Sequence, residues 1–456
     1  MKLKTTILSF ALVFCGNLMS QTVSHFAGKV NETNANTKYN NSTCAFADVY
    51  FYKPEGITWD NKDNMWITEK NKIRLLYNNQ FYNRGGAIGD GDQSSGYANG
   101  TTGASCLFSE PSSIVSDASG NLFVVDLGNH AIRKIVAFTS TGQSQEITTF
   151  AGADAPNPLP GSTTDVSGKA ARFYYPQAIA RDANGNFYLT DLYNSTIRKI
   201  TSAGFVSTLA GTPGTAGSKD GKTGVATFES PFGIAFLDAD NLVISDQSAG
   251  TIRKITLSTF MVSTICGKAG FNETVDGTLA NASFKSPKGI AVVDGRIFVC
   301  DGSVIRVIDI AKNKVSTYAG SSTEGNKDGI GTAAQFGNLV GMAYNAKTKL
   351  LYVTDHTYNI IKTVTIVTIG ISKVSNNFSF NVAPNPSGGL FTIENSDKNL
   401  PIQSLELADI TGKVLFIKTC HNSLSETFDL SNFQNGFYFV KVNTSKGSSI
   451  LKLQKN

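Results

Sequence analysis

A short pattern of phenylalanine, proline and a small residue recurs along this chain and constrains its fold more than any other feature. Pro follows Phe by three residues and the small residue follows Pro by two; only the sixth copy departs, with Leu339 in place of Pro. Self-similarity at a spacing of 52 to 65 residues is typical of a solenoid or a propeller. The copies are FYKPEG (51–56), FSEPSS (108–113), FYYPQA (173–178), FESPFG (228–233), FKSPKG (284–289) and FGNLVG (336–341).

Each copy continues with short runs of β-branched and aromatic residues separated by polar turns. The third copy reads AIAR, the turn DANGN, then FYLT, IRKI and VSTLAG. Such runs predict antiparallel strands. One four-stranded meander cannot bury both of its faces, whereas six meanders arranged radially can cover one another. We therefore predict an all-β fold, a six-bladed β-propeller followed by a small C-terminal β-sandwich.

The predicted propeller occupies residues 21–370. Its ring needs a closing strand, because TVSHFAG (22–28) reads as a fourth strand without its first three. We favour pairing of this segment with the last blade, which would remove exposed edges. The alternative closing segment is TIVTIG (365–370). The blades are expected near residues 51–86, 108–152, 173–211, 228–267, 284–320 and 336–370.

The repeats resemble the NHL-repeat family, whose pattern is close to PxGIAxDxxGNxYVxDxxNxRIRKI followed by VSTLAG. The resemblance covers residues 22–370 and implies a six-bladed β-propeller. The first copy departs from the pattern at Glu69, and the last copy departs at Leu339 and Lys362.

The two ends of the chain predict an exported protein. Residues 1–20 read as a signal peptide, with Lys2 and Lys4 before a short apolar core. Lipidation at Cys15 is a weaker alternative, because Phe14 precedes it where a small residue is needed. The mature chain has no other apolar run long enough to span a bilayer, so we do not expect a membrane-spanning protein.

A second block of β-runs follows a polar linker at residues 371–377. Residues 378–456 resemble the C-terminal type A sorting domain of type IX secretion. The resemblance implies contact with that secretion machinery and passage across both membranes, to the medium or the outer-membrane surface. The residues that carry it are Pro384, Asn385, Pro386, Gly389, Asp409, Gly412, Lys413, Asp429, Leu430, Ser431, Gly436, Tyr438, Lys452 and Leu453.

An acidic residue closes the second run of every copy. Asp at a strand end commonly bonds nearby backbone. A basic residue follows seven positions later in four copies, as in Asp126/Arg133, Asp191/Arg198, Asp246/Arg253 and Asp355/Lys362. A short hairpin would bring each pair together, so we interpret the acids as structural rather than cation-binding. The set is Glu69, Asp126, Asp191, Asp246, Asp301 and Asp355.

Sequence support for catalysis or metal binding is weak. The four histidines form neither HxxxH nor HExxH, and the cysteines lack CxxC spacing, so we predict no metal and no cofactor. The Asp-Gly pairs at 90–91, 220–221, 276–277 and 328–329 are interpreted as turns. Five cysteines follow the signal peptide, and a Cys44–Cys106 bridge remains open. The alternative to a non-enzymatic module is a calcium-dependent lactonase or hydrolase with its site in the central channel.

The candidate binding surface is the face that carries the long connections between repeats and the short loops after each second strand. Aromatic residues on such loops commonly mark binding sites. The candidates are His130, Tyr193, His356 and Tyr358, which could equally pack between blades. We predict a monomeric binding or scaffolding module for a protein or glycan. Nucleic acid is not expected, because the formal charge is only +5 and no Lys/Arg run exists.

Overall fold

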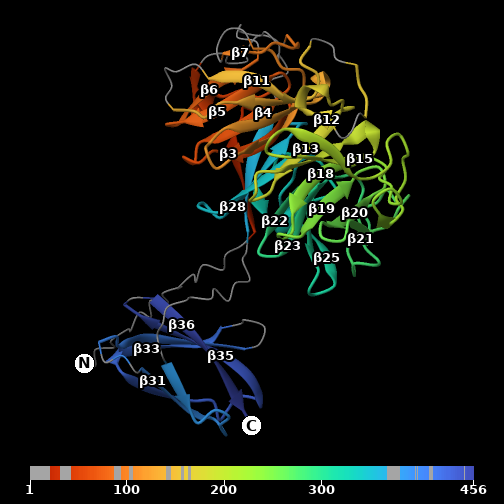
Figure 1. The fold of residues 1–456 in the computed structure, drawn as a ribbon. Helices are drawn as coiled ribbons and strands as arrows, with labels where there is room; N and C mark the ends of the chain where they lie inside the picture. Colours follow the sequence, from red (N-terminus) through yellow and green to blue (C-terminus); the bar gives the residue numbers. More distant parts are fainter. Residues whose placement is uncertain are drawn as a thin grey trace, which may run out of the picture. The chain divides into compact units, whose positions relative to one another are not determined.

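The computed structural model divides the chain into two compact units, Met1–Val367 and Thr368–Asn456, here called the repeat unit and the C-terminal unit (Figure 1). The predicted signal peptide and linker lie outside the described residues. Both units are built from antiparallel strands, and the helical turns of the described residues are single 3₁₀ turns, so the predicted all-β class is confirmed. The described residues are 21–30, 43–86, 94–101, 106–139, 145–155, 159–162, 166–366, 380–395, 397, 399–409, 414–445 and 447–456.

The repeat unit contains six described sheets, and each of the first five is built on a four-stranded meander in chain order. Sheet 1 contains β3 (Pro54–Trp59), β4 (Met65–Glu69), β5 (Lys72–Tyr77) and β6 (Gln80–Gly85). Sheet 2 contains β8 (Pro111–Ser116), β9 (Leu122–Asp126), β10 (Ala131–Ile135) and β11 (Glu146–Ala151). Sheet 3 contains β13 (Pro176–Arg181), β14 (Phe187–Asp191), β15 (Thr196–Ile200) and β16 (Phe205–Ala210).

The later sheets repeat this order, and sheet 6 takes its outer strand from the start of the chain. Sheet 4 contains β18 (Pro231–Phe236), β19 (Asn241–Asp246), β20 (Thr251–Thr256) and β21 (Met261–Gly267). Sheet 5 contains β22 (Pro287–Val293), β23 (Arg296–Asp301), β24 (Val304–Asp309) and β25 (Lys314–Gly320). Sheet 6 contains β27 (Leu339–Asn345), β28 (Leu350–Asp355), β29 (Ile360–Thr365) and β1 (Thr22–Ala27).

Short outer strands, which the sequence did not predict, extend five of the sheets. Each outer strand precedes its meander in the chain and pairs with the fourth strand of the same sheet. In sheet 5 a single bridge between Gly277 and Val315 takes this place. The strands are β2 (Thr43–Ala45), β7 (Gly100–Thr101), β12 (Val166–Ser167), β17 (Gly221–Lys222) and β26 (Gly329–Ile330). The 3₁₀ turns are η1 (Phe46–Asp48), η2 (Leu127–Asn129), η3 (Gly168–Ala170), η4 (Leu192–Asn194) and η5 (Gly331–Ala333).

The first strands of the sheets contact one another in a closed circuit. The order is β3, β8, β13, β18, β22, β27 and back to β3, which joins residues almost 300 positions apart (Figure 1). The strand β1 pairs antiparallel with β29, with Val23 opposite Val364. Residues 367–370 of the alternative closing segment lie outside the described residues.

Close approach at the axis explains the small residue that follows each anchor proline. A Cβ atom on Gly341 would lie 1.9 Å from the Glu55 carbonyl oxygen of the neighbouring sheet. On Gly233 it would lie 2.3 Å from the Lys288 carbonyl oxygen. Distances this short are excluded by van der Waals contact, so these positions must be glycine.

Apolar side chains fill the space between every two neighbouring sheets. Each of six clusters combines residues of two adjacent sheets; one joins Val124 of sheet 2 to Trp66 and Ile73 of sheet 1. The anchor phenylalanines lie in these clusters and are at most 2% exposed. Because both faces of a sheet are covered, its strands need not alternate between apolar and polar residues.

A hydroxyl group links most neighbouring sheets near the axis. Thr354 accepts a hydrogen bond from the Gly341 amide (2.8 Å) and donates one to the Glu55 carbonyl of sheet 1 (2.9 Å). Thr68, Thr190 and Ser245 occupy the same position in sheets 1, 3 and 4. Their hydroxyl groups donate to carbonyls of the next sheet, those of Ser112, Phe232 and Lys288 respectively. Sheet 2 has Val125 at this position, and there Ser112 on the first strand donates to the Gln177 carbonyl instead (2.7 Å).

We expect Thr354→Val to lower the free energy of unfolding by about 1–3 kcal/mol, because it leaves a buried amide and a buried carbonyl without their partner. Val125 shows that valine fits this position. Adding Val340→Ser, which copies the arrangement of sheet 2, should restore part of the loss. Urea denaturation followed by circular dichroism measures both variants. Unchanged stability of the single variant would contradict this role for the hydroxyl.

The C-terminal unit contains two described sheets around one apolar core. The first sheet has β30 (Phe380–Ala383), β31 (Leu390–Asn395) and β34 (Ser425–Asp429). The second has β32 (Ile402–Asp409), β33 (Val414–Ser423), β35 (Gly436–Thr444) and β36 (Gly447–Lys455). Phe391 and Phe428 of the first sheet share the core with Leu407 and Val440 of the second.

Candidate functional site

One face of the repeat unit is here called the loop face. On it, the loop after each second strand is hydrogen-bonded to the segment that leads into the first strand. The amide of Tyr193 donates to the Tyr174 carbonyl (3.1 Å), and the amide of His356 donates to the Asn338 carbonyl (2.9 Å). The residues predicted for binding therefore lie beside the residues that precede the anchor prolines.

Three tyrosines and a histidine form an aromatic cluster on the loop face, here called the tyrosine platform. The Tyr193 ring lies 5.2 Å from Tyr174 and 5.0 Å from Tyr175, measured between ring centroids. Tyr193 is 56% exposed and Tyr174 is 37% exposed. The predicted site thus contains Tyr193, and it also contains two residues that the sequence analysis did not select. Their signal lay in FYYPQA, where two adjacent tyrosines precede the proline.

His130 is the buried member of the platform and packs against Tyr175. Its ring is buried and lies 5.0 Å from the Tyr175 ring. The Tyr175 amide lies 3.2 Å from His130 Nδ1 and the Leu127 carbonyl oxygen lies 3.1 Å from the same nitrogen, so the tautomer of the ring decides which of the two bonds forms. Burial lowers the pKa of His130, which favours the neutral ring. Tyr175 has a positive φ of 51°, a strained conformation for a bulky residue before proline.

His356 lies apart from the platform, near the axis. Its Nε2 lies 3.5 Å from Glu55 Oε1. The pKa of His356 is lowered to about 3, chiefly by burial and also by the nearby Lys288 and Lys53 charges. Tyr358 is half-buried, and its amide donates to Asp355 Oδ1 (3.2 Å). The structure therefore groups Tyr193 with His130 and places His356 at a second location.

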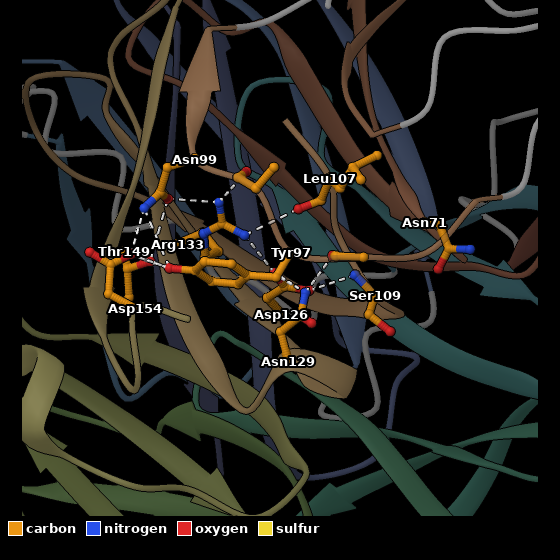
Figure 2. A network of polar contacts seen from close by, with 12 residues as sticks. Asn71, Tyr97, Asn99, Leu107, Ser109, Asp126, Asn129, Arg133, Thr149 and Asp154 are labelled. Atoms are coloured by element: carbon orange, nitrogen blue, oxygen red, sulfur yellow. Dashed lines mark hydrogen bonds and ion pairs between the residues drawn. The ribbon is translucent and has the colours of Figure 1, made fainter. Parts of the chain in front are cut away.

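The blade acids lie in buried polar networks, and Figure 2 shows the network of sheet 2. Asp126 Oδ2 lies 2.8 Å from Arg133 Nη1, and its Oδ1 accepts the Ser109 amide (2.8 Å). Burial raises the pKa of Asp126 to about 6, although Arg133 opposes this shift. The guanidinium of Arg133 also lies over the anchor Phe108, 5.1 Å from its centroid. The recurring IRKI phrase thus places an arginine between the anchor ring and the blade acid.

Comparable ion pairs recur in sheets 1, 3, 4 and 5, and sheet 6 differs. Lys362 of sheet 6 pairs with Asp328 (3.0 Å), while Asp355 accepts the amides of Gly337, Thr357 and Tyr358. The equivalent pairs are Glu69–Arg74, Asp191–Arg198 (2.9 Å), Asp246–Arg253 (3.6 Å) and Asp301–Arg306 (3.3 Å).

The interpretation of the Asp-Gly pairs as turns was wrong for the three that the structure describes. Asp220, Asp276 and Asp328 each bond the buried basic residue of their sheet, as in the 2.8 Å contact between Asp220 and Arg253. Their glycines pair with the fourth strand of each sheet: Gly221 with Val262 of β21, Gly277 with Val315 of β25 and Gly329 with Val23 of β1. An Asp-Gly pair favours a turn through local backbone contacts. Here the ion pair between each Asp and a basic residue distant in the sequence determined the conformation instead. Asp90 and Gly91 lie outside the described residues.

Cysteine and metal chemistry can be stated for the described part of the chain. No three His, Cys, Asp or Glu side chains of those residues gather in a group that could hold a metal ion. Burial raises the pKa of Cys266 to about 12, which favours the thiol. Cys44 packs against the cluster between sheets 6 and 1, whereas Cys106 lies in the cluster between sheets 1 and 2.

The predicted sorting residues hold the C-terminal unit together. Asn385 donates to the Lys452 carbonyl and accepts the Gln454 amide, each at 2.8 Å. The Tyr438 hydroxyl donates to the Gln434 carbonyl (2.6 Å). Pro384 and Pro386 flank Asn385, and Gly436 begins β35. Gly412 and Lys413 lie outside the described residues.

A family model supports the prediction for the C-terminal unit. Residues 381–456 match the secretion system C-terminal sorting domain. This domain implies export by type IX secretion to the cell surface or outer membrane. Within the residues described, no helix has the length and apolar character needed to cross a membrane.

Two curated proteins are similar to this chain. It is 25% identical over 289 residues to Protein SUPPRESSOR OF QUENCHING 1, chloroplastic, of Arabidopsis thaliana, covering 60% of this chain and 26% of that protein. It is 25% identical over 284 residues to NHL repeat-containing protein 2 of Bos taurus, covering 55% of this chain and 38% of that protein. The chain therefore spans less than two fifths of either relative.

Solved structures share the fold at low identity. A Bacteroides thetaiotaomicron protein of unknown function aligns with a TM-score of 0.55 at 18% identity, covering 76% of each chain. An auxiliary nutrient binding protein from Bacteroides ovatus aligns with a TM-score of 0.54 at 17% identity, again covering 76% of each chain. Together, the comparisons confirm the two resemblances predicted from sequence, to NHL-repeat propellers and to the sorting domain.

Proposed function

We propose that this chain is a secreted or surface-attached binding module that holds a glycan on the tyrosine platform without catalysing a reaction. The six sheets act as the blades of one six-bladed propeller, and the C-terminal unit is a small sandwich that addresses the protein to type IX secretion. We also propose that the repeat unit works as a monomer, since the pairing of β1 with β29 covers an edge of sheet 6.

The observation that carries this proposal is the exposure of Tyr174 and Tyr193 in mutual contact. Exposing the apolar face of an aromatic ring to water is unfavourable in free energy. Tyrosine combines such a face with a hydroxyl group. Such rings suit the apolar face of a sugar ring, whose edges carry hydroxyl groups. The strained Tyr175 and the buried His130 fix the rings in place, which reduces the entropy lost on binding.

We expect the double variant Tyr174→Ala/Tyr193→Ala to bind its glycan about 5- to 150-fold more weakly, because each of the two aromatic contacts contributes about 0.5–1.5 kcal/mol. A glycan array on the purified full chain identifies the ligand, and titration calorimetry measures the loss. Neither side chain is buried, so circular dichroism should report an unchanged fold.

The matched control is Phe260→Ala. Phe260 is 52% exposed and lies in the turn between β20 and β21, outside the loop face. It should bind the glycan as the unaltered chain does. Array binding that survives the tyrosine double variant would refute the platform as the site. A pull-down that captures a protein through the same tyrosines would replace the glycan by a protein ligand.

A further inference from the structure

A groove at the outer rim of the repeat unit lies between sheets 3 and 4. It is lined by Lys199 and residues 207–209 of sheet 3, and by residues 222–223 and 259–260 of sheet 4, and is here called the rim groove. Its volume is about 590 Å³, within the range of about 300–1,000 Å³ that is typical of small-molecule sites. Residues 259–260 belong to the turn between β20 and β21, so they lie at the opposite end of β20 from the loop face.

Thr223 joins the two walls of the rim groove. Its amide donates to the Phe260 carbonyl of sheet 4 (3.1 Å), and its hydroxyl donates to the Leu209 carbonyl of sheet 3 (2.8 Å). The Leu209 side chain is buried in the apolar cluster between the same two sheets. The groove is therefore held in its shape before a ligand binds, which lowers the entropy lost on binding.

Two lysines give the rim groove a positive charge. Lys199 lies on β15, with its Nζ 6.0 Å from the Tyr188 centroid, and Lys222 lies on the outer strand β17. Among the described residues that line the groove there is no Asp or Glu. Ser207 and Thr259 add hydroxyl groups to the lining. Positive charge without an opposing carboxylate favours an anionic ligand.

Phe260 supplies an apolar ring to the groove, and its backbone conformation is unfavourable. Its φ of 54° lies in the left-handed region, where a bulky residue is an outlier. The equivalent residue of sheet 5 is Asn313, which ends a turn of the same length with a φ of 49°. Asparagine adopts this conformation more readily. Because Phe260 is exposed, burial does not account for the ring, and strain of this kind is commonly retained where function needs a side chain.

We propose that the rim groove binds an acidic saccharide, with one sugar ring on Phe260 and the carboxylate or sulfate groups on Lys199 and Lys222. A sugar chain supplies an apolar ring face, hydroxyl groups and negative charge within one repeating unit. A free anion has no face to contact Phe260, and the acidic side chains of a peptide offer no ring. This site and its ligand are independent of the tyrosine platform.

Titration calorimetry on the full chain tests the proposal with two acidic probes, trigalacturonate and a sulfated galactose trisaccharide. The matched neutral probe is the methyl ester of trigalacturonate, which keeps the rings and lacks the charges. We expect one acidic trisaccharide to bind per chain, more weakly when sodium chloride is added. The methyl ester should bind about 2- to 30-fold more weakly than trigalacturonate, the range for two exposed ion pairs. Lys199→Met/Lys222→Met should weaken binding of trigalacturonate by the same factor.

Phe260→Asn separates the function of the ring from its effect on stability. The variant should bind the acidic trisaccharide about 2- to 13-fold more weakly, because one aromatic contact is lost. It copies Asn313 of sheet 5, so its midpoint of urea denaturation should rise. A ring with a structural role alone would lower that midpoint when removed and leave binding unchanged, and this result would contradict the proposal.

The control variant is Lys134→Met. Lys134 is the equivalent lysine of the IRKI phrase in sheet 2, with its Nζ 6.0 Å from the Phe123 centroid, and its variant should bind the acidic trisaccharide as the unaltered chain does. The tyrosine double variant should also retain this binding. Phe260→Ala should lose it and keep the glycan of the platform, so failure of one site is distinguished from failure of the other.

Absence of saturable binding for both acidic trisaccharides at millimolar concentration would overturn the proposal. Equal binding of the acid and its methyl ester would overturn it, as would unchanged binding by the lysine double variant with a folded circular dichroism spectrum. Hexaglutamate that binds as tightly as trigalacturonate, and is lost with the same lysines, would replace the saccharide by an acidic peptide.

Discussion

Replacing Arg198 with methionine is expected to lower the free energy of unfolding by about 3–5 kcal/mol, because it leaves the buried carboxylate of Asp191 without its cation. The side chains of both residues are fully buried, with Arg198 Nη1 2.9 Å from Asp191 Oδ2. The guanidinium also lies 5.4 Å from the Phe173 centroid, so an interaction with the anchor ring is lost as well. Guanidinium denaturation followed by circular dichroism measures the effect.

Two variants separate the ion pair from the volume of the side chain. Lys199→Met alters the next residue on β15, which is only half-buried, and should change stability by less than about 1 kcal/mol. The combined variant Asp191→Leu/Arg198→Met should recover part of the loss, since it removes both buried charges. If Arg198→Met denatures at the same midpoint as the unaltered chain, the network does not stabilise the sheet.

Val23→Asp should have an effect of similar size, about 3–5 kcal/mol, because it puts a charge where the ring closes. Val23 is 1% exposed and belongs to the apolar cluster that joins sheets 5 and 6. Its strand β1 covers the edge of β29, and an uncovered edge promotes association. Thermal denaturation and size-exclusion chromatography should therefore show an earlier transition and self-association.

Ser24→Asp is the matched control, one residue away on the same strand. Ser24 is exposed and keeps its backbone pairing with Thr363. We expect its stability to change by less than about 0.5 kcal/mol, as for other surface substitutions. Equal stability of the Val23 and Ser24 variants would show that β1 does not hold the ring closed.

Much of the fold could be predicted because its signals are local. The run FYLT lies within β14, and VSTLAG contains the end of β16. Turn residues and β-branched runs act over a few positions, so they can be recognised one repeat at a time. The seven-residue spacing from Asp191 to Arg198 predicted a contact that the hairpin makes.

The tyrosine platform was predicted only in part, for the opposite reason. Tyr193 was identified because it lies on a short loop, whereas Tyr174 and Tyr175 were overlooked because their contact with Tyr193 depends on how two segments pair. The outer strands were missed because two or three residues are too few to show a β pattern.

The sequence by itself determined the repeat, the strand pattern within each repeat and the C-terminal sorting domain, since each depends on neighbouring residues. Only the tertiary structure decided that Glu55 of sheet 1 and His356 of sheet 6 line one cavity, although they are far apart in the sequence. Side chains so far apart meet only when the last sheet packs against the first. Closure of the ring is favoured by the apolar surface that is buried between all the sheets together. No single stretch of sequence shows that total.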